Sequence, residues 1–269
     1  MLSRYFFKKI GEETVKIVED GYYNHIYAGK VSIEQEVKAC VDGTKLYMPN
    51  DFKLPEVNLD KIVTKFEVTG ETTLEAAERL HNQNPLCLNF ASATSPGGGF
   101  LRGAIAQEET IARSSALYAS LISKEGYYKH NIESEDKLYT DCMIYSPDVP
   151  IFRRDNGEFL PNPYFCSVIT SPAVNRSNTE GVDETFIFAA MIKRIFKILS
   201  VAIEKKHDSL ILGAWGCGVF GNNPKEVAMM FHLVLNNPRF INHFKNITFA
   251  VYDVSREMKN IGPFLELFS

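Results

Sequence analysis

Two neighbouring carboxylates, Glu108 and Glu109, follow a run of three glycines at a short interval in the segment PGGGFLRGAIAQEE. Successive glycines lack Cβ atoms and can adopt positive φ angles, so backbone N–H groups can approach a ligand closely. Adjacent carboxylates beside such a loop supply what glycosidic-bond hydrolysis requires, namely a proton donor for the leaving oxygen and hydrogen bonds to the sugar. Acidic residues in a first helical turn also complement the helix dipole, so a structural interpretation stays open for the pair alone.

A second glycine-rich segment, GAWGCGVFGNNP, spans residues 213–224. It lies between an apolar stretch and Pro224, a residue type that favours the first turn of a helix. A loop of this kind can wrap a diphosphate at a helix N-terminus. It lacks the GK[ST] of a Walker A loop, and no acidic residue about 20 positions on completes a dinucleotide fingerprint. A turn that binds no ligand is the structural alternative.

Strand-like and helix-like segments alternate around these two loops. Helical patterns cover residues 3–20, 72–83, 104–122 and 183–206, with Ser3 as a cap and a capping box formed by Thr72 and Glu75. We expect neighbouring core strands at residues 88–92, 167–171, 210–214 and 248–252. The alternation predicts an α/β fold with helices on both faces of a sheet, and it places both glycine loops at the carboxyl edge. Prolines and glycines interrupt residues 124–164, which predicts an irregular excursion over the surface.

The first loop with its flanks, NFASATSPGGGFLRGAIAQEE, resembles the signature of the poly(ADP-ribose) glycohydrolases, and most closely their compact bacterial-type branch. The second loop is similar to the diphosphate loop of that family, GCG-x-FG. The likeness extends from about residue 60 to the C-terminus. It implies a macrodomain-like α/β fold, a mixed sheet sandwiched between helices with a short N-terminal helical extension. We therefore divide the chain into an extension, residues 1–60, and a catalytic domain, residues 61–269.

The resemblance implies hydrolysis of the ribose–ribose O-glycosidic bond of poly(ADP-ribose) from chain ends, with release of ADP-ribose. In this interpretation Glu109 donates a proton to the leaving 2′-oxygen and then, as a carboxylate, activates water. Glu108 is offset from it by about 100° on a helix and hydrogen-bonds the ribose hydroxyls. Two other functions stay open, a reader that binds ADP-ribose without cleaving it and a hydrolase of single ADP-ribose units. A pure reader has no need for Gln107, Glu108 and Glu109, and this favours an enzyme.

The same resemblance implies the residues that bind substrate. Around the first loop they are Asn89, Ser92, Gly97, Gly98, Gly99 and Gln107. In the second loop they are Gly216, Cys217, Gly218, Val219 and Phe220, which would hold the diphosphate, with Phe220 against the distal ribose. Tyr252 would stack on adenine. Three of these residues have structural alternatives: Asn89 as a partner of the backbone, Tyr252 as ordinary strand packing, and Cys217 as a small residue that fits its loop.

The composition limits the partners. The net charge of −4 argues against a general polyanion binder, so a phosphate-rich ligand is expected in a local pocket. The five cysteines and six histidines show no metal-binding spacing, which predicts no metal, no cofactor and a reduced compartment. No apolar stretch approaches the roughly 20 residues of a membrane helix. We expect an intracellular protein, cytoplasmic or nuclear, that acts on poly(ADP-ribose) or ADP-ribosylated macromolecules, yields ADP-ribose, and binds neither membranes nor nucleic acids in general.

Overall fold

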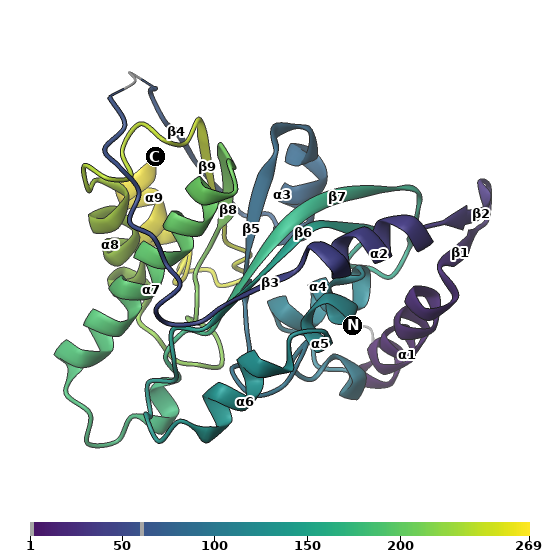
Figure 1. The fold of residues 1–269 in the computed structure, drawn as a ribbon, viewed down its shortest axis with the longest axis horizontal. Coiled ribbons are helices and arrows are strands. Elements are labelled where there is room, and N and C mark those ends of the chain that lie inside the picture. Colours follow the sequence, from purple (N-terminus) through teal and green to yellow (C-terminus); the bar gives the residue numbers. More distant parts are fainter. Residues whose placement is uncertain (1–2, 60–61) are drawn as a thin grey trace.

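The structure is a computed structural model that describes residues 3–59 and 62–269. Its helices are α1 (Arg4–Asp20), α2 (Glu34–Gly43), α3 (Thr73–Leu80), α4 (Gln107–Ser114), α5 (Leu117–Ile122), α6 (Glu125–Glu133), α7 (Glu184–Glu204), α8 (Pro224–Leu235) and α9 (Gly262–Phe268) (Figure 1). Its strands are β1 (Tyr22–His25), β2 (Gly29–Ser32), β3 (Lys45–Tyr47), β4 (Lys65–Thr69), β5 (Pro85–Phe90), β6 (Met143–Arg153), β7 (Phe159–Ser171), β8 (Ser209–Leu212) and β9 (Asn246–Ala250).

Seven of the described strands form one mixed sheet in the order β3-β6-β7-β5-β8-β9-β4. Strands β7, β5, β8, β9 and β4 pair in parallel, whereas β3, β6 and β7 pair antiparallel. The four core strands predicted from the sequence are the neighbours β7, β5, β8 and β9, so this prediction is confirmed. Their shared direction brings the loops that follow β5 and β8 to the same edge of the sheet.

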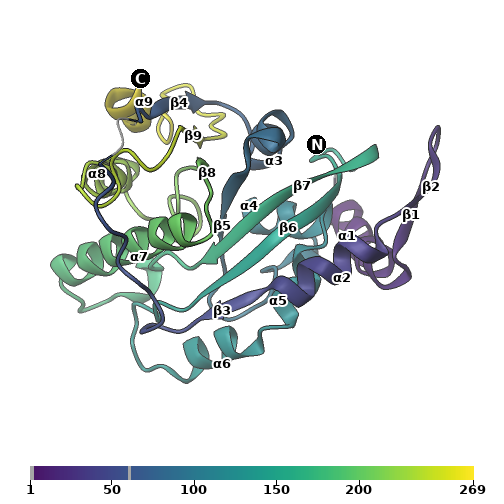
Figure 2. The ribbon, with the colours of Figure 1, turned by 45° about the horizontal axis from the view of Figure 1, so that its top comes forward.

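The core strands are buried on both faces because their side chains alternate between two hydrophobic cores. Leu86 and Leu88 of β5 pack in the core formed with α7, α8 and α9. Cys87, between them, packs in the core formed with α3, α4 and α5. Figures 1 and 2 show α7 and α8 on one side of the sheet and α4 and α5 on the other. The predicted sheet between helices is confirmed.

Three of the predicted helix starts carry the expected caps. The Ser3 hydroxyl accepts a hydrogen bond from the Phe6 N–H at the start of α1. Thr72 and Glu75 form the reciprocal capping box of α3, and Pro224 occupies the first turn of α8. The starts of these three helices therefore lie where the sequence predicts them.

The single helix predicted over residues 104–122 is wrong, because the chain forms α4 and α5 with a break between them. Ser115 is extended, with φ −148° and ψ 177°, and bridges to Ile151 of β6. The next residue, Ala116, donates its N–H to the Pro150 carbonyl at 3.0 Å. The backbone thus pairs with a strand at this point, and tertiary contact overrides helix propensity.

The surface excursion predicted over residues 124–164 is also wrong. The stretch contains α6 and most of the β6–β7 hairpin, and most of β6 is buried. The β6–β7 register shifts between Ser146 and Val149, where Asp148 has a φ of 40°. Pro147 lies at this irregularity, where a strand tolerates a residue that cannot donate to the ladder.

The N-terminal residues contact the rest of the fold. Strand β3 pairs with β6 at the edge of the main sheet, and β1 and β2 form a separate hairpin. The domain boundary predicted between residues 60 and 61 lies outside the described residues, and the division of the chain there stays a prediction. None of the described helices is long and apolar enough to cross a membrane.

Candidate active site

A cleft of about 810 Å³ lies at the carboxyl edge of the sheet and is lined by both glycine loops. The first loop contributes Gly98 and Gly99, and the second contributes residues 216–220. Tyr252, which follows β9, lies on its wall as well. The expectation that the two loops share one pocket is therefore confirmed.

Gln107 fastens the start of α4 to the end of β5. Its Oε1 accepts a hydrogen bond from the Phe90 N–H at 2.8 Å, and its Nε2 donates to the Leu88 carbonyl at 2.8 Å and to the Thr73 Oγ1 at 3.1 Å. The amide is thus occupied by protein partners on both sides. This anchor sets the direction in which the next two residues, Glu108 and Glu109, enter the cleft.

Glu108 is a buried carboxyl group, 4% exposed, at the inner wall of the cleft. Its Oε2 accepts from the Ser92 N–H at 2.7 Å and its Oε1 from the Asn89 Nδ2 at 3.3 Å. Burial raises the pKa of Glu108 to about 8, an effect that these two hydrogen bonds oppose and the neighbouring Glu109 charge reinforces. At neutral pH Glu108 is therefore mainly a neutral carboxylic acid.

Glu109 is held by the glycine loop itself. Its Oε1 accepts from the Gly99 N–H at 2.8 Å. Gly98 has a φ of +60°, which favours glycine, and a methyl group in place of its hydrogen would lie 2.4 Å from the same Oε1, so a side chain there would displace the Glu109 carboxyl group. Within the described residues, none donates a hydrogen bond to Oε2 of Glu109, which leaves this atom available to a ligand in the cleft.

The second loop turns sharply at Gly216, whose φ is +74°. A Cβ on Gly216 would lie 2.5 Å from that of Ala173 and 2.6 Å from the Asn222 Nδ2. This Nδ2 donates to the Val174 carbonyl at 2.8 Å and to the Gly216 carbonyl at 3.1 Å. The loop is thus tied to the end of β7. Gly218 has open space around it, because no atom lies within 4 Å of a Cβ placed there.

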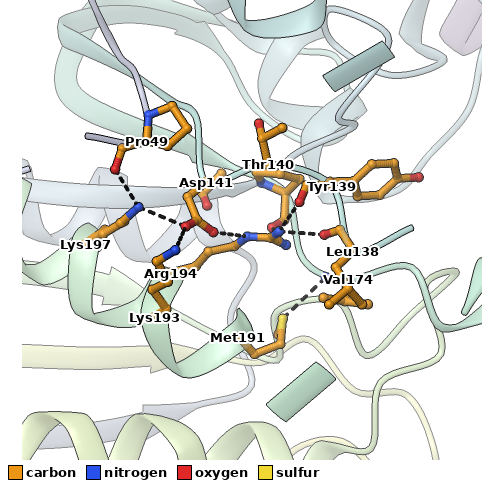
Figure 3. Close-up of polar contacts among 12 residues, drawn as sticks. Pro49, Leu138, Tyr139, Thr140, Asp141, Val174, Met191, Lys193, Arg194 and Lys197 are labelled. Carbon is orange, nitrogen blue, oxygen red and sulfur yellow. Dashed lines mark hydrogen bonds and ion pairs between the residues drawn. The ribbon is translucent and has the colours of Figure 1, made fainter. Parts of the chain in front are cut away.

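A cluster of buried charged side chains contacts the segment 172–174, which packs against the second loop (Figure 3). Arg194 of α7 donates to the Asp141 Oδ1 at 3.2 Å and to the Pro172 carbonyl at 3.1 Å. Met191 accepts the Val174 N–H on its Sδ at 3.3 Å. Burial alone would raise the pKa of Asp141, but the bonds from the nearby lysines outweigh it and hold the pKa below its ordinary value. Residues 172–174, which back the second loop, are therefore fixed from the α7 side.

Tyr252 is 65% exposed at the rim of the cleft. The next residue, Asp253, folds the following loop by accepting from the N–H groups of Ser255 at 2.8 Å, Asn260 at 2.6 Å and Ile261 at 3.1 Å. Burial alone would raise the pKa of Asp253, but these hydrogen bonds lower it to about 2. The folded loop brings Asn260 to the cleft beside Tyr252.

Most of the residues predicted from the sequence line this cleft: Ser92, Gly98, Gly99, Gln107, Glu108, Glu109, Gly216, Cys217, Gly218, Val219, Phe220 and Tyr252. Two lie behind it. Asn89 is fully buried beneath Glu108 and bonds to the Thr170 Oγ1, and Gly97 packs against the ring of Phe100. Burial raises the pKa of the Cys217 thiol to about 12, which agrees with a small packing residue rather than a nucleophile.

Several cleft residues were not predicted, among them Phe7, Thr73, Ile105, Arg113 and Asp155. Arg113 lies one helical turn after Glu109, so its spacing could have signalled it. Phe7 and Asp155 come from α1 and the β6–β7 hairpin, and no local pattern marks them. In the part of the chain that the structure describes, no three His, Cys, Asp or Glu side chains are placed to hold a metal ion.

Comparison with known proteins gives consistent matches. The family model "Microbial-type PARG, catalytic domain" matches residues 11–154. The crystal structure of poly(ADP-ribose) glycohydrolase (PARG) from Thermomonospora curvata is 42% identical, with a TM-score of 0.94 over 98% of this chain and 100% of that chain. The same enzyme bound to the inhibitor ADP-HPD matches with 42% identity and a TM-score of 0.89 over 97% of this chain and 99% of that one. The enzyme from Deinococcus radiodurans in complex with ADP-ribose is 40% identical, with a TM-score of 0.81 over 86% and 96%. A search of curated proteins found no match.

Proposed function

The chain belongs to the microbial-type poly(ADP-ribose) glycohydrolases, and we propose from this premise how its own residues bind and cleave the polymer. The enzyme is a glycosidase that hydrolyses the ribose–ribose O-glycosidic bond of poly(ADP-ribose). We propose that it acts at chain ends and releases ADP-ribose. Its structural relatives hold ADP-ribose or the inhibitor ADP-HPD, which supports ADP-ribose as the ligand of this cleft.

The terminal ADP-ribose unit lies along the cleft between the two loops. Backbone N–H groups of residues 216–220 surround the diphosphate near the N-terminus of α8, where the helix dipole favours negative charge. The open space around Gly218 leaves room for a phosphate oxygen. The distal ribose then lies against Gly98, Gly99 and Glu108, with Phe220 beside it. Tyr252, exposed at the rim, presents a ring on which adenine can stack.

Glu109 is the acid and then the base of the reaction. Its Oε1 is fixed by the Gly99 N–H, so the opposite oxygen, Oε2, can carry the proton that passes to the leaving 2′-oxygen. As the glycosidic bond breaks, positive charge develops at the anomeric carbon of the distal ribose. The Glu109 carboxylate then takes a proton from the attacking water. The water hydroxyl completes the ribose, and the proton regenerates the acid.

Glu108 orients the sugar. Both of its oxygens are tied to the end of β5, through Ser92 and Asn89, so its position is fixed. Because burial keeps it protonated at neutral pH, it presents an O–H to a ribose hydroxyl without adding a negative charge beside the diphosphate. This pairing of a fixed, neutral carboxyl with a second carboxyl open to the cleft is the observation that carries the proposal.

The test compares Glu109→Gln with Glu108→Gln on poly(ADP-ribose), with ADP-ribose binding measured separately by calorimetry. Glu109→Gln keeps the side-chain shape but cannot cycle a proton, so we expect binding to persist and kcat to fall by about 10²–10⁴-fold. Glu108→Gln can still hydrogen-bond a hydroxyl, so the loss is smaller and follows from misplacement of the sugar.

The opposite ranking of the two variants would exchange the two roles. Full activity in both would refute the mechanism. A wild-type protein that binds ADP-ribose without releasing it from the polymer would be a reader, and cleavage restricted to single ADP-ribose units on protein would identify a mono-ADP-ribosyl hydrolase.

A further inference from the structure

Arg102 lies on the rim of the cleft beside the proposed acid. It ends the short 3₁₀ helix Phe100–Arg102 that follows the first glycine loop, and its side chain is exposed and lines the cleft. A methyl group placed on Gly99 would lie 3.5 Å from the Arg102 Nη2 and 3.6 Å from the Glu109 Oε1. The guanidinium and the carboxylate therefore approach the same point of the loop.

The backbone of Arg102 is fixed while its charge stays unpaired. The Arg102 carbonyl accepts a hydrogen bond from the Arg4 Nε of α1 at 2.9 Å. Gly103, with a φ of +76°, packs so tightly on α1 that a Cβ there would lie 2.0 Å from the Arg4 carbonyl oxygen. Among the described residues, by contrast, none forms an ion pair or accepts a hydrogen bond from the Arg102 guanidinium.

The other arginine that lines the cleft already has protein partners. Arg113 is 2% exposed, its guanidinium lies 4.8 Å from the centre of the Phe7 ring, and it bonds to the Ala104 carbonyl. The described residues that line the cleft include no other basic side chain. Arg102 is thus the cation available to an anion that extends from the cleft past Glu109.

The substrate places such an anion there. In poly(ADP-ribose) the leaving 2′-oxygen belongs to the adenosine ribose of the preceding unit, and the same ribose carries a diphosphate at its 5′ position. Free ADP-ribose, once released, has no such neighbour. We propose that Arg102 binds a phosphate of this leaving unit and so makes the enzyme prefer the polymer. The inference rests on the proposed function, and the chemistry suits it, because a guanidinium fork matches phosphate oxygens.

The experiment measures KM and kcat on poly(ADP-ribose), and the inhibition constant of ADP-ribose as a competitor that lacks the leaving unit. We expect Arg102→Gln to raise KM for the polymer roughly fivefold at low salt, the scale of an exposed ion pair. The inhibition constant and kcat should stay within about twofold, because the terminal unit and Glu109 are untouched. The KM difference from wild type should shrink as salt screens the contact. Arg102→Lys should recover part of the loss, since it keeps a point charge.

Arg256→Gln is the matched control. It removes the same charge from an exposed arginine in the loop after Tyr252 that does not line the cleft. An equal rise in KM for Arg102→Gln and Arg256→Gln would assign the effect to overall charge and overturn the inference. A parallel loss of ADP-ribose binding or of kcat in Arg102→Gln would also overturn it. If the wild type itself releases no ADP-ribose from the polymer, the proposed function fails instead.

Discussion

Substitution of Glu108 by Gln should remove a large pH dependence of stability. In the folded protein burial raises the pKa of Glu108 from 4.5 to about 8. In the unfolded chain the carboxyl group ionises near 4.5, so unfolding between pH 4.5 and 8 releases a proton. The stability contribution of the protonated group is therefore complete below pH 4.5 and is lost as the pH rises through 8. At about 1.4 kcal/mol for each pH unit, the loss comes to about 5 kcal/mol of the free energy of unfolding.

The glutamine can be accommodated if the Asn89 amide rotates, at the pH-independent cost of leaving the Asn89 Nδ2 in the buried position where Oδ1 now lies without a partner. The Asn89 Oδ1 is buried and has no hydrogen-bond partner in the described structure, while its Nδ2 donates to Glu108. Rotation of the Asn89 amide would turn Oδ1 toward the Nε2 of a glutamine at position 108. The variant should therefore fold, and its stability should lack the part of the pH dependence that Glu108 contributes.

The measurement is urea unfolding of wild type and Glu108→Gln at pH 5, 7 and 9. Because the other titrating groups are common to both, their contributions cancel in the difference between the two proteins. We expect this difference to move by several kcal/mol in favour of the variant from pH 5 to 9. Glu71→Gln is the control, since a hydrogen bond from Arg79 holds the pKa of Glu71 below its ordinary value and the carboxylate stays ionised over this range. If the difference in the free energy of unfolding between Glu108→Gln and wild type changes with pH as little as that for Glu71→Gln, the assigned protonation state of Glu108 is refuted.

Two further predictions concern the second loop. Gly218→Val should weaken ADP-ribose binding in calorimetry without loss of thermal stability, because the side chain meets no protein atom and projects into the space assigned to the diphosphate; unchanged affinity would mean that the loop is structural. Asn222→Ala removes the bonds to the Val174 and Gly216 carbonyls, about 1 kcal/mol each, and should raise KM while kcat at saturation changes little. The control is Asn223→Ala at the adjacent position. It removes only the N-cap of α8 and should lower the melting temperature without changing KM. Equal KM values for these two variants would contradict the role of Asn222.

The sequence was sufficient for the parts of the fold that local chemistry determines. The core strands carry continuous apolar runs, and Thr72 with Glu75 forms the capping box that their spacing predicts. Both glycine loops met in one cleft because parallel strands end at one edge. The break of α4 at Ser115 could not be predicted this way, since it depends on a backbone bridge to Ile151, 36 positions away in the chain. The part of the β6–β7 hairpin within residues 124–164 was predicted as a surface excursion because its prolines suggest a loop until the strand irregularity that accepts them is known.

In the candidate site, too, the sequence predicts the residue types but not their surroundings. The residue types of Glu108 and Glu109 suggested carboxyl chemistry, but their different environments arise from partners that the sequence does not order in space. Glu108 is buried because Gln107 ties the first turn of α4 to β5. The sequence alone predicts Gln107 as a substrate-binding residue and does not indicate this anchoring contact. Glu109 can lie against the first glycine loop because Gly98 has no Cβ to overlap its Oε1.

The charges that line the cleft favour a neutral Glu108 beside Glu109. Among the described residues, four carboxyl groups line the cleft, from Glu75, Glu108, Glu109 and Asp155, together with the guanidinium groups of Arg102 and Arg113. A diphosphate that enters such a site gains from backbone N–H groups but is repelled by each ionised carboxylate. Burial raises the pKa of Glu108 to about 8 and also raises that of Asp155, so both lose negative charge more readily than exposed acids do. The same burial that costs stability at high pH thus lets a carboxyl-lined cleft hold a dianion, whereas Glu109 keeps its Oε2 open to the substrate.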